Sequence, residues 1–96
     1  MSDETQGTPI VREFVILNQY GIHARPAALF VKIASRYDAD IQVQKGDNTV
    51  SGKSIMGLMT LEASRGAKLT VAADGPDAEE LLDELQELIE SKFDEE

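Results

Sequence analysis

The segment GIHARPAALF, residues 21–30, brings together residue types that can hold an anion. It contains the only histidine of the chain, His23, followed by Arg25 and Pro26. A neutral imidazole nitrogen is a nucleophile that can form a covalent intermediate, and a guanidinium can bind phosphate oxygens through two hydrogen bonds. This chemistry favours a phosphoryl group carried on His23. A lone histidine is more often structural, so spacing alone leaves open a His23 packed in the core.

The position of His23 between two predicted elements strengthens the chemical interpretation. Residues 10–17 are β-branched and aromatic and predict a strand. Ala27, Phe30, Val31 and Ala34 follow the spacing of one helix face, so a helix is expected from Pro26 to about Arg36. Proline is tolerated in the first turn of a helix. His23 therefore lies just before a helix N-terminus, where free N–H groups and the positive dipole end favour an anion.

The rest of the chain predicts three more strands and two more helices. Strands are expected at 40–45, at 49–53 and at 67–74, and helices at 54–63, with Ser54 as N-cap, and at 77–93, with Asp77 as N-cap. The last helix shows the clearest apolar stripe, formed by Leu81, Leu82, Leu85, Leu88 and Ile89. The order β-α-β-β-α-β-α predicts an α+β fold, a four-stranded antiparallel sheet with three helices on one face.

Composition limits the class of protein. The chain has 96 residues, enough for one domain, and no cysteine, so disulfides and thiolate zinc sites are excluded. Its net charge of −9 arises within residues 77–96, and residues 1–76 are neutral. Nucleic-acid binding needs a basic surface and is not expected. With neither a signal peptide nor a membrane-spanning stretch in the sequence, the expected location is the cytoplasm.

Several aliphatic side chains are expected outside the core, near His23. Leu29 and Ile33 point away from the buried stripe of their helix, and the weak helix at 54–63 adds Ile55, Met56 and Met59. Methionine adapts to several partners, and Lys32 and Lys53 add positive charge. A protein-docking surface is the favoured interpretation, although exposed aliphatic residues with no function are also common.

Two stretches resemble a known family. The stretch GIHARPAALFVKIAS is similar to the active-site segment of the HPr family, the histidine-containing phosphocarriers of the bacterial phosphoenolpyruvate-dependent sugar phosphotransferase system (PTS). The stretch GKSIMGLMTL is similar to the second signature of the family, a short helix opened by a regulatory serine. The resemblance covers residues 10–93 and implies an HPr-like open-faced sandwich there. Outside it, the polar and acidic residues 1–9 are expected to be a disordered extension, and residues 94–96 are an acidic end.

The resemblance also implies residue roles and partners. His23 matches the histidine that accepts a phosphoryl group from Enzyme I on Nδ1 and passes it to IIA domains of sugar permeases, and Arg25 matches the arginine that balances the phosphate charge. Ser54 matches the serine that an HPr kinase/phosphorylase modifies in many bacteria, and a transcriptional regulator is a further expected partner. No cofactor, metal ion or membrane insertion is implied, and a monomer is expected. One departure is Glu62, where many members have glycine.

Two other functions remain open at this point. A regulatory or nitrogen-branch HPr relative would take phosphate on His23 without feeding sugar transport. A ligand-binding or RNA-binding α+β module would share the order of elements, although the chain lacks tryptophan and aromatic stacking motifs.

Overall fold

The structure is a computed structural model that describes residues 8–95; the extension expected at residues 1–9 falls mostly outside this range. Its regular elements are β1 (Ile10–Val15), α1 (Ala24–Ala34), β2 (Asp40–Lys45), β3 (Asn48–Ser51), α2 (Ile55–Thr60), β4 (Lys68–Asp74), α3 (Ala78–Glu90) and a short 3-10 turn, η2 (Lys92–Asp94). No helix among these residues is long and apolar enough to cross a membrane.

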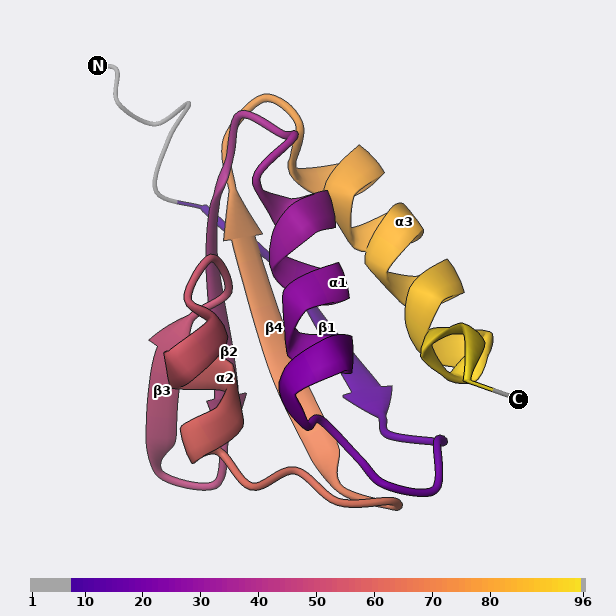
Figure 1. Ribbon diagram of the computed structural model, residues 1–96. Coiled ribbons are helices and arrows are strands. Elements are labelled where there is room, and N and C mark those ends of the chain that lie inside the picture. The colour runs from indigo at the N-terminus through magenta and orange to yellow at the C-terminus, as the bar shows by residue number, and fades with distance from the viewer. Residues whose placement is uncertain (1–7, 96) are drawn as a thin grey trace.

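The four strands form one antiparallel sheet in the order β1-β4-β2-β3. All three α-helices lie on the same face of this sheet, as Figure 1 shows, and the other face carries no helix. The predicted open-faced sandwich is therefore confirmed.

The core lies between the helices and the covered face of the sheet. Alternation along β2 buries Ile41 and Val43, and alternation along β4 buries Leu69 and Val71. The α3 residues of the predicted apolar stripe are all buried: Leu81, Leu82, Leu85, Leu88 and Ile89. On α1 the buried residues include Ala27, Phe30 and Ala34, whereas Val31 and Tyr37 are half-buried at the edge of the core.

The ends of several elements differ from the sequence-based expectation. Helix α1 begins at Ala24 rather than Pro26, so His23 itself is the N-cap residue. Strand β1 ends at Val15 rather than at Leu17; the next residue, Ile16, still donates to Ala67 O at 2.9 Å, but Ala67 already belongs to the turn before β4. Helix α2 spans only Ile55–Thr60, and Ser54 caps it as expected.

The Asp77 carboxylate does not cap α3, which corrects the sequence-based expectation. Asp77 occupies the N-cap position, but its side chain makes no capping hydrogen bond. Its Oδ2 instead accepts from the backbone N–H of Asp38 at 2.8 Å. The carboxylate therefore ties the loop after α1 to the start of α3.

Helix α3 is also held by polar contacts to α1 and β1. The Arg36 guanidinium and the Tyr37 hydroxyl both donate to the Glu84 carboxylate. The Tyr37 hydrogen bond lowers the pKa of Glu84 and raises the pKa of Tyr37. On the other side, Arg12 of β1 pairs with Asp83 at 2.8 Å. These contacts fix the path of α3, which carries the C-terminal residues toward the start of α1.

The backbone at Glu62 is left-handed, with φ of 52°. A side chain makes this conformation unfavourable by roughly 1–2 kcal/mol, and glycine adopts it freely. Glu62→Gly is therefore expected to raise the free energy of unfolding by about 0.5–1 kcal/mol, after allowing for the extra freedom of glycine in the unfolded chain. Urea denaturation measures the change. Glu62→Ala is the control, since it keeps a Cβ and should bring no gain; equal stabilities of the Gly and Ala variants would contradict the account.

Candidate functional site

The loop between β1 and α1 is fixed by Gly21 and Ile22. Gly21 has φ of 69°, and a Cβ there would lie 2.2 Å from Ala63 O, so no other residue fits. Ile22 is buried and its amide donates to Ala63 O at 2.9 Å. The loop is thus held against the segment that follows α2, and this contact sets where the next residue, His23, lies.

His23 lies at the surface, at the start of α1. Its backbone is extended, and its carbonyl accepts from the Ala27 amide at 3.0 Å, as an N-cap carbonyl does. Its side chain makes no capping hydrogen bond and is 44% exposed. The interpretation of His23 as a core histidine does not agree with this position.

Arg25 shares a hollow with His23. The hollow, about 450 Å³ in volume, is lined by Gln19, Tyr20, His23, Arg25, Asp94 and Glu95. Arg25 is exposed and makes no hydrogen bond or ion pair within the described part of the chain, so its guanidinium is available to a ligand. It is the second residue of α1, where backbone N–H groups lack helical acceptors. The hollow therefore combines a guanidinium, an imidazole and a helix N-terminus.

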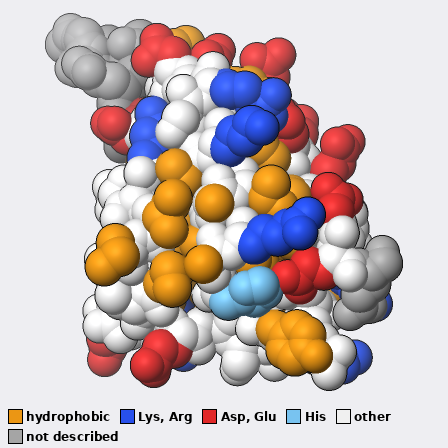
Figure 2. Space-filling model, viewed as in Figure 1, with side chains coloured by type: hydrophobic (Ala, Val, Ile, Leu, Met, Phe, Trp, Pro, Cys, Tyr) orange, Lys and Arg blue, Asp and Glu red, His pale blue; other side chains and the backbone are white. Residues whose placement is uncertain are grey.

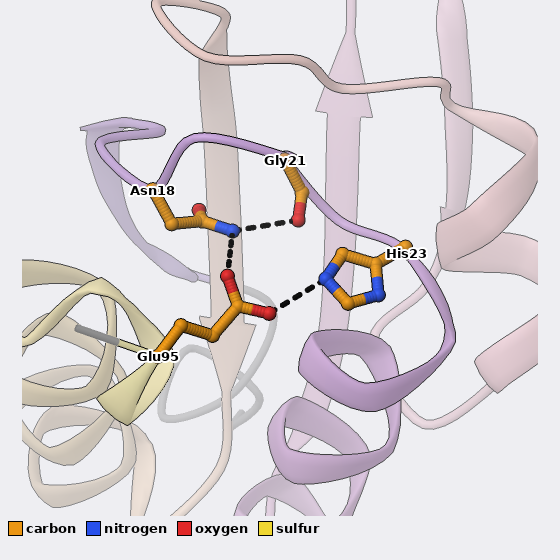
Figure 3. Close-up of polar contacts among 4 residues, drawn as sticks. All are labelled: Asn18, Gly21, His23 and Glu95. Carbon is orange, nitrogen blue, oxygen red and sulfur yellow. Dashed lines mark hydrogen bonds and ion pairs between the residues drawn. The ribbon is translucent and has the colours of Figure 1, made fainter.

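A carboxylate from the other end of the chain binds the imidazole (Figure 3). His23 Nε2 lies 2.6 Å from Glu95 Oε2. The other oxygen of Glu95 accepts from Asn18 Nδ2 at 3.0 Å, and the same Asn18 amide donates to Gly21 O at 2.8 Å. Asn18 is fully buried. A buried amide thus holds both the loop and the carboxylate.

This arrangement fixes which ring nitrogen is free. The hydrogen bond from Asn18, together with the hydrogen bond and charge of His23 and the charge of Arg25, holds the pKa of Glu95 below its ordinary value although burial raises it. An ionised carboxylate only accepts, so Nε2 must carry the proton. In the neutral ring Nδ1 then has the lone pair, and within residues 8–95 Nδ1 has no hydrogen-bond partner. Nδ1 is therefore free to react.

Comparison with known proteins shows the family of this chain. A family model described as "PTS HPr component phosphorylation site" matches residues 10–91. The chain belongs to the HPr family of phosphocarriers.

Relatives in this family are similar over nearly their whole length. The phosphocarrier protein HPr of Treponema pallidum (strain Nichols) is 41% identical over 87 residues, which cover 91% of this chain and 99% of that protein. The phosphocarrier protein NPr of Shewanella violacea is 38% identical over 88 residues, covering 92% and 97%. A crystal structure of HPr from Thermoanaerobacter tengcongensis superposes with a TM-score of 0.87 at 47% identity, covering 91% and 98%.

A second feature of this HPr-family chain is a group of exposed apolar side chains on α2, formed by Ile55, Met56 and Met59 and called the apolar surface below. Figure 2 shows hydrophobic side chains gathered over α2 and the start of α1, beside the pale-blue histidine. Met56 is 74% exposed, and Ile55 and Met59 are also exposed. Leu29 and Ile33 are half-buried because they pack partly against the core. They are therefore less exposed to a docking partner than the helix spacing predicts. Lys32 and Lys53 are both exposed.

Ser54 caps α2 through its side chain. Its Oγ accepts from the Gly57 amide at 2.9 Å, which confirms the predicted N-cap. A Cβ at Gly57 would lie 3.0 Å from that Oγ, so Gly57 keeps the cap uncrowded. The hydroxyl is half-buried at the edge of the apolar surface.

Asn18 and Glu95 were not predicted from the sequence. Glu95 was assigned to an acidic end beyond the domain, and it is one of ten acids in residues 77–96. Asn18 lies in a segment that predicts only a turn. The one available signal is that Asn18 is a polar residue directly after the strand pattern of residues 10–17, which does not identify its partner.

Proposed function

We propose that this HPr-family protein accepts a phosphoryl group on His23 from phospho-Enzyme I and transfers it to IIA domains of sugar permeases. The observation that supports this most directly is the state of the ring. Nε2 is held by Glu95 at 2.6 Å, while Nδ1 has no hydrogen-bond partner within residues 8–95, and Arg25 lines the same hollow as His23.

The proposed step is a direct displacement at phosphorus. The Nδ1 lone pair forms the new N–P bond, and the bond from phosphorus to the leaving atom of the donor breaks, with its electron pair remaining on the donor. The Arg25 guanidinium and the free amides at the start of α1 offset the charge on the phosphoryl oxygens. Transfer to an acceptor reverses these roles, with His23 as the leaving group.

The donor and the acceptors would dock on the apolar surface around α2. A carrier must fit at least two different proteins, and Met56 and Met59 can adapt their side chains to both. Lys32 and Lys53 add charge complementarity toward acidic partners. The protein acts in this proposal as a monomer in the cytoplasm, without a cofactor or metal ion of its own.

Ser54 is the proposed regulatory site, modified by an HPr kinase/phosphorylase. A phosphate on Oγ would add about −2 charge at the helix start, on the edge of the docking surface. The phosphorylated protein would then be presented to a transcriptional regulator instead of to Enzyme I. Negative charge is compatible with this position, because the N-terminus of a helix favours it.

A nitrogen-branch phosphocarrier is the second candidate, and it is favoured by the 38% identity to an NPr. It would use the same His23 chemistry with a different donor. Parallel assays with the sugar-branch and the nitrogen-branch donor proteins, at equal concentrations, distinguish the two. Faster uptake from the nitrogen-branch donor would support this alternative.

Phosphorus NMR of the purified protein tests the proposal. With Enzyme I and phosphoenolpyruvate, one acid-labile signal of an Nδ1-phosphohistidine is expected, and it should disappear when a IIA domain is added. Treatment with the serine kinase and ATP should give a separate, acid-stable signal. No acid-labile signal with either donor protein would refute the proposal.

A further inference from the structure

The end of the chain is built to bring Glu95 to the imidazole. After α3, three successive residues that are not glycine, Lys92, Phe93 and Asp94, have left-handed backbones with φ of 59°, 56° and 59°. Such conformations persist where the surrounding structure determines them. Phe93 is fully buried and anchors this turn. The Glu95 side chain that follows is only 15% exposed, unlike a freely solvated terminal acid.

Both carboxylate oxygens of Glu95 have defined partners. Oε1 accepts from the buried Asn18 amide at 3.0 Å, and Oε2 accepts from His23 Nε2 at 2.6 Å. Asn18 also holds Gly21 O, so one side chain fixes the carboxylate relative to the loop that carries His23. The three residues come from opposite ends of the chain, and their order in space is Asn18, Glu95, His23 (Figure 3).

We propose that Glu95 is a positioning residue for phosphoryl uptake: it keeps the proton of His23 on Nε2 and stabilises the cationic ring that forms when Nδ1 is phosphorylated. This inference rests on the proposed function of His23.

The charge balance of the step gives the physical reason. When Nδ1 of a ring protonated on Nε2 forms the N–P bond, no proton leaves, and the ring becomes an imidazolium. A carboxylate on the second nitrogen fixes the tautomer and orientation of an imidazole and stabilises its cationic form. Glu95 thus offsets the charge of the ring, while Arg25 offsets the charge of the phosphoryl oxygens. The two nitrogens point in different directions, so the carboxylate does not take the place of the phosphoryl group.

Glu95→Gln tests the inference, with Glu87→Gln as the matched control. Glu87 is exposed on α3, does not line the hollow, and its side chain makes no hydrogen bond or ion pair within residues 8–95. The control therefore makes the same substitution and removes the same charge at a position away from His23. Two measurements are made on the full chain: ¹⁵N NMR of the ring nitrogens of His23, and the initial rate of phosphoryl uptake from limiting phospho-Enzyme I.

In the wild-type protein and in Glu87→Gln, the proton should be found on Nε2 with the signature of a strong hydrogen bond. In Glu95→Gln this signature should disappear, and uptake should slow roughly tenfold, as expected for loss of a charge-assisted hydrogen bond. Unchanged ring signals and unchanged uptake in Glu95→Gln would overturn the inference. So would an equal loss of rate in Glu87→Gln, because the effect would then be one of general charge.

The same measurements test the proposed function separately from the role of Glu95. If the wild-type protein takes up no phosphoryl group on His23, the carrier function is wrong. In that case the ring signals alone still decide whether Glu95 fixes the tautomer.

Discussion

His23→Asn is expected to lose acid-labile phosphoryl uptake by roughly 10⁴-fold or more, down to the detection limit. His23 is the only histidine of the chain, so no second imidazole can replace its Nδ1. Asparagine is a favourable N-cap, and the His23 side chain makes no capping hydrogen bond, so the start of α1 should be kept or strengthened. Incubation with Enzyme I and labelled phosphoenolpyruvate measures the uptake.

Two comparisons separate a chemical loss from a folding defect. The urea midpoint of His23→Asn should stay close to that of the wild type, because the better N-cap offsets the loss of the surface contact with Glu95. Arg25→Gln should keep the label on His23 but slow its uptake roughly ten- to a hundredfold, because the phosphoryl oxygens lose a charged donor. Lys68→Gln removes the same charge from an exposed position on β4 and should change nothing. Label retained by His23→Asn would show that another residue is the acceptor.

Ser54→Asp is expected to slow phosphoryl uptake by roughly ten- to a hundredfold with little change in stability. Aspartate is also a good N-cap, so it can keep the hydrogen bond that Ser54 Oγ accepts from Gly57. Its charge lies at the edge of the apolar surface and opposes an acidic donor protein. Ser54→Ala should show the reverse: normal uptake, and a free energy of unfolding lower by about 1 kcal/mol.

The effect of Ser54→Asp should also depend on salt and on position. Because charge repulsion at a surface is screened, raising the ionic strength should recover part of the lost rate. Thr49→Asp adds the same charge on β3, on the face of the sheet without helices, and should leave uptake unchanged. An equal loss in Thr49→Asp, or a loss that salt does not change, would contradict a docking role for the Ser54 region.

The fold was predictable because its patterns are local and repeated. The alternation of Ile41 and Val43 with glutamines predicts a half-buried strand. The five apolar residues of the α3 stripe have helical spacing and predict an amphipathic helix. Element ends were less predictable. Strand β1 ends where the partner segment turns at Ala67, whose amide donates to Ser64 O, and the carboxylate of Asp77 accepts from the Asp38 amide instead of from its own helix. Both outcomes depend on residues distant in sequence.

The sequence by itself determined which functional residues lie together when they are only a few positions apart in the chain. His23, Arg25 and Pro26 are adjacent in the chain, so any helix starting there places an imidazole and a guanidinium at its N-terminus. In the same way Ser54 and Gly57 are a capping distance apart, and Ser54 caps α2.

Only the tertiary structure decided which nitrogen of His23 is free. Glu95 is 72 residues from His23, and ten acids in its segment are alike in the sequence. Two tertiary features distinguish Glu95 from the other acids. The buried Phe93 anchors the left-handed turn that precedes Glu95, and the buried Asn18 amide donates a hydrogen bond to its carboxylate. A contact of this kind depends on how the core packs, because packing sets the distance between residues that are far apart in the chain, and no local sequence pattern encodes that distance.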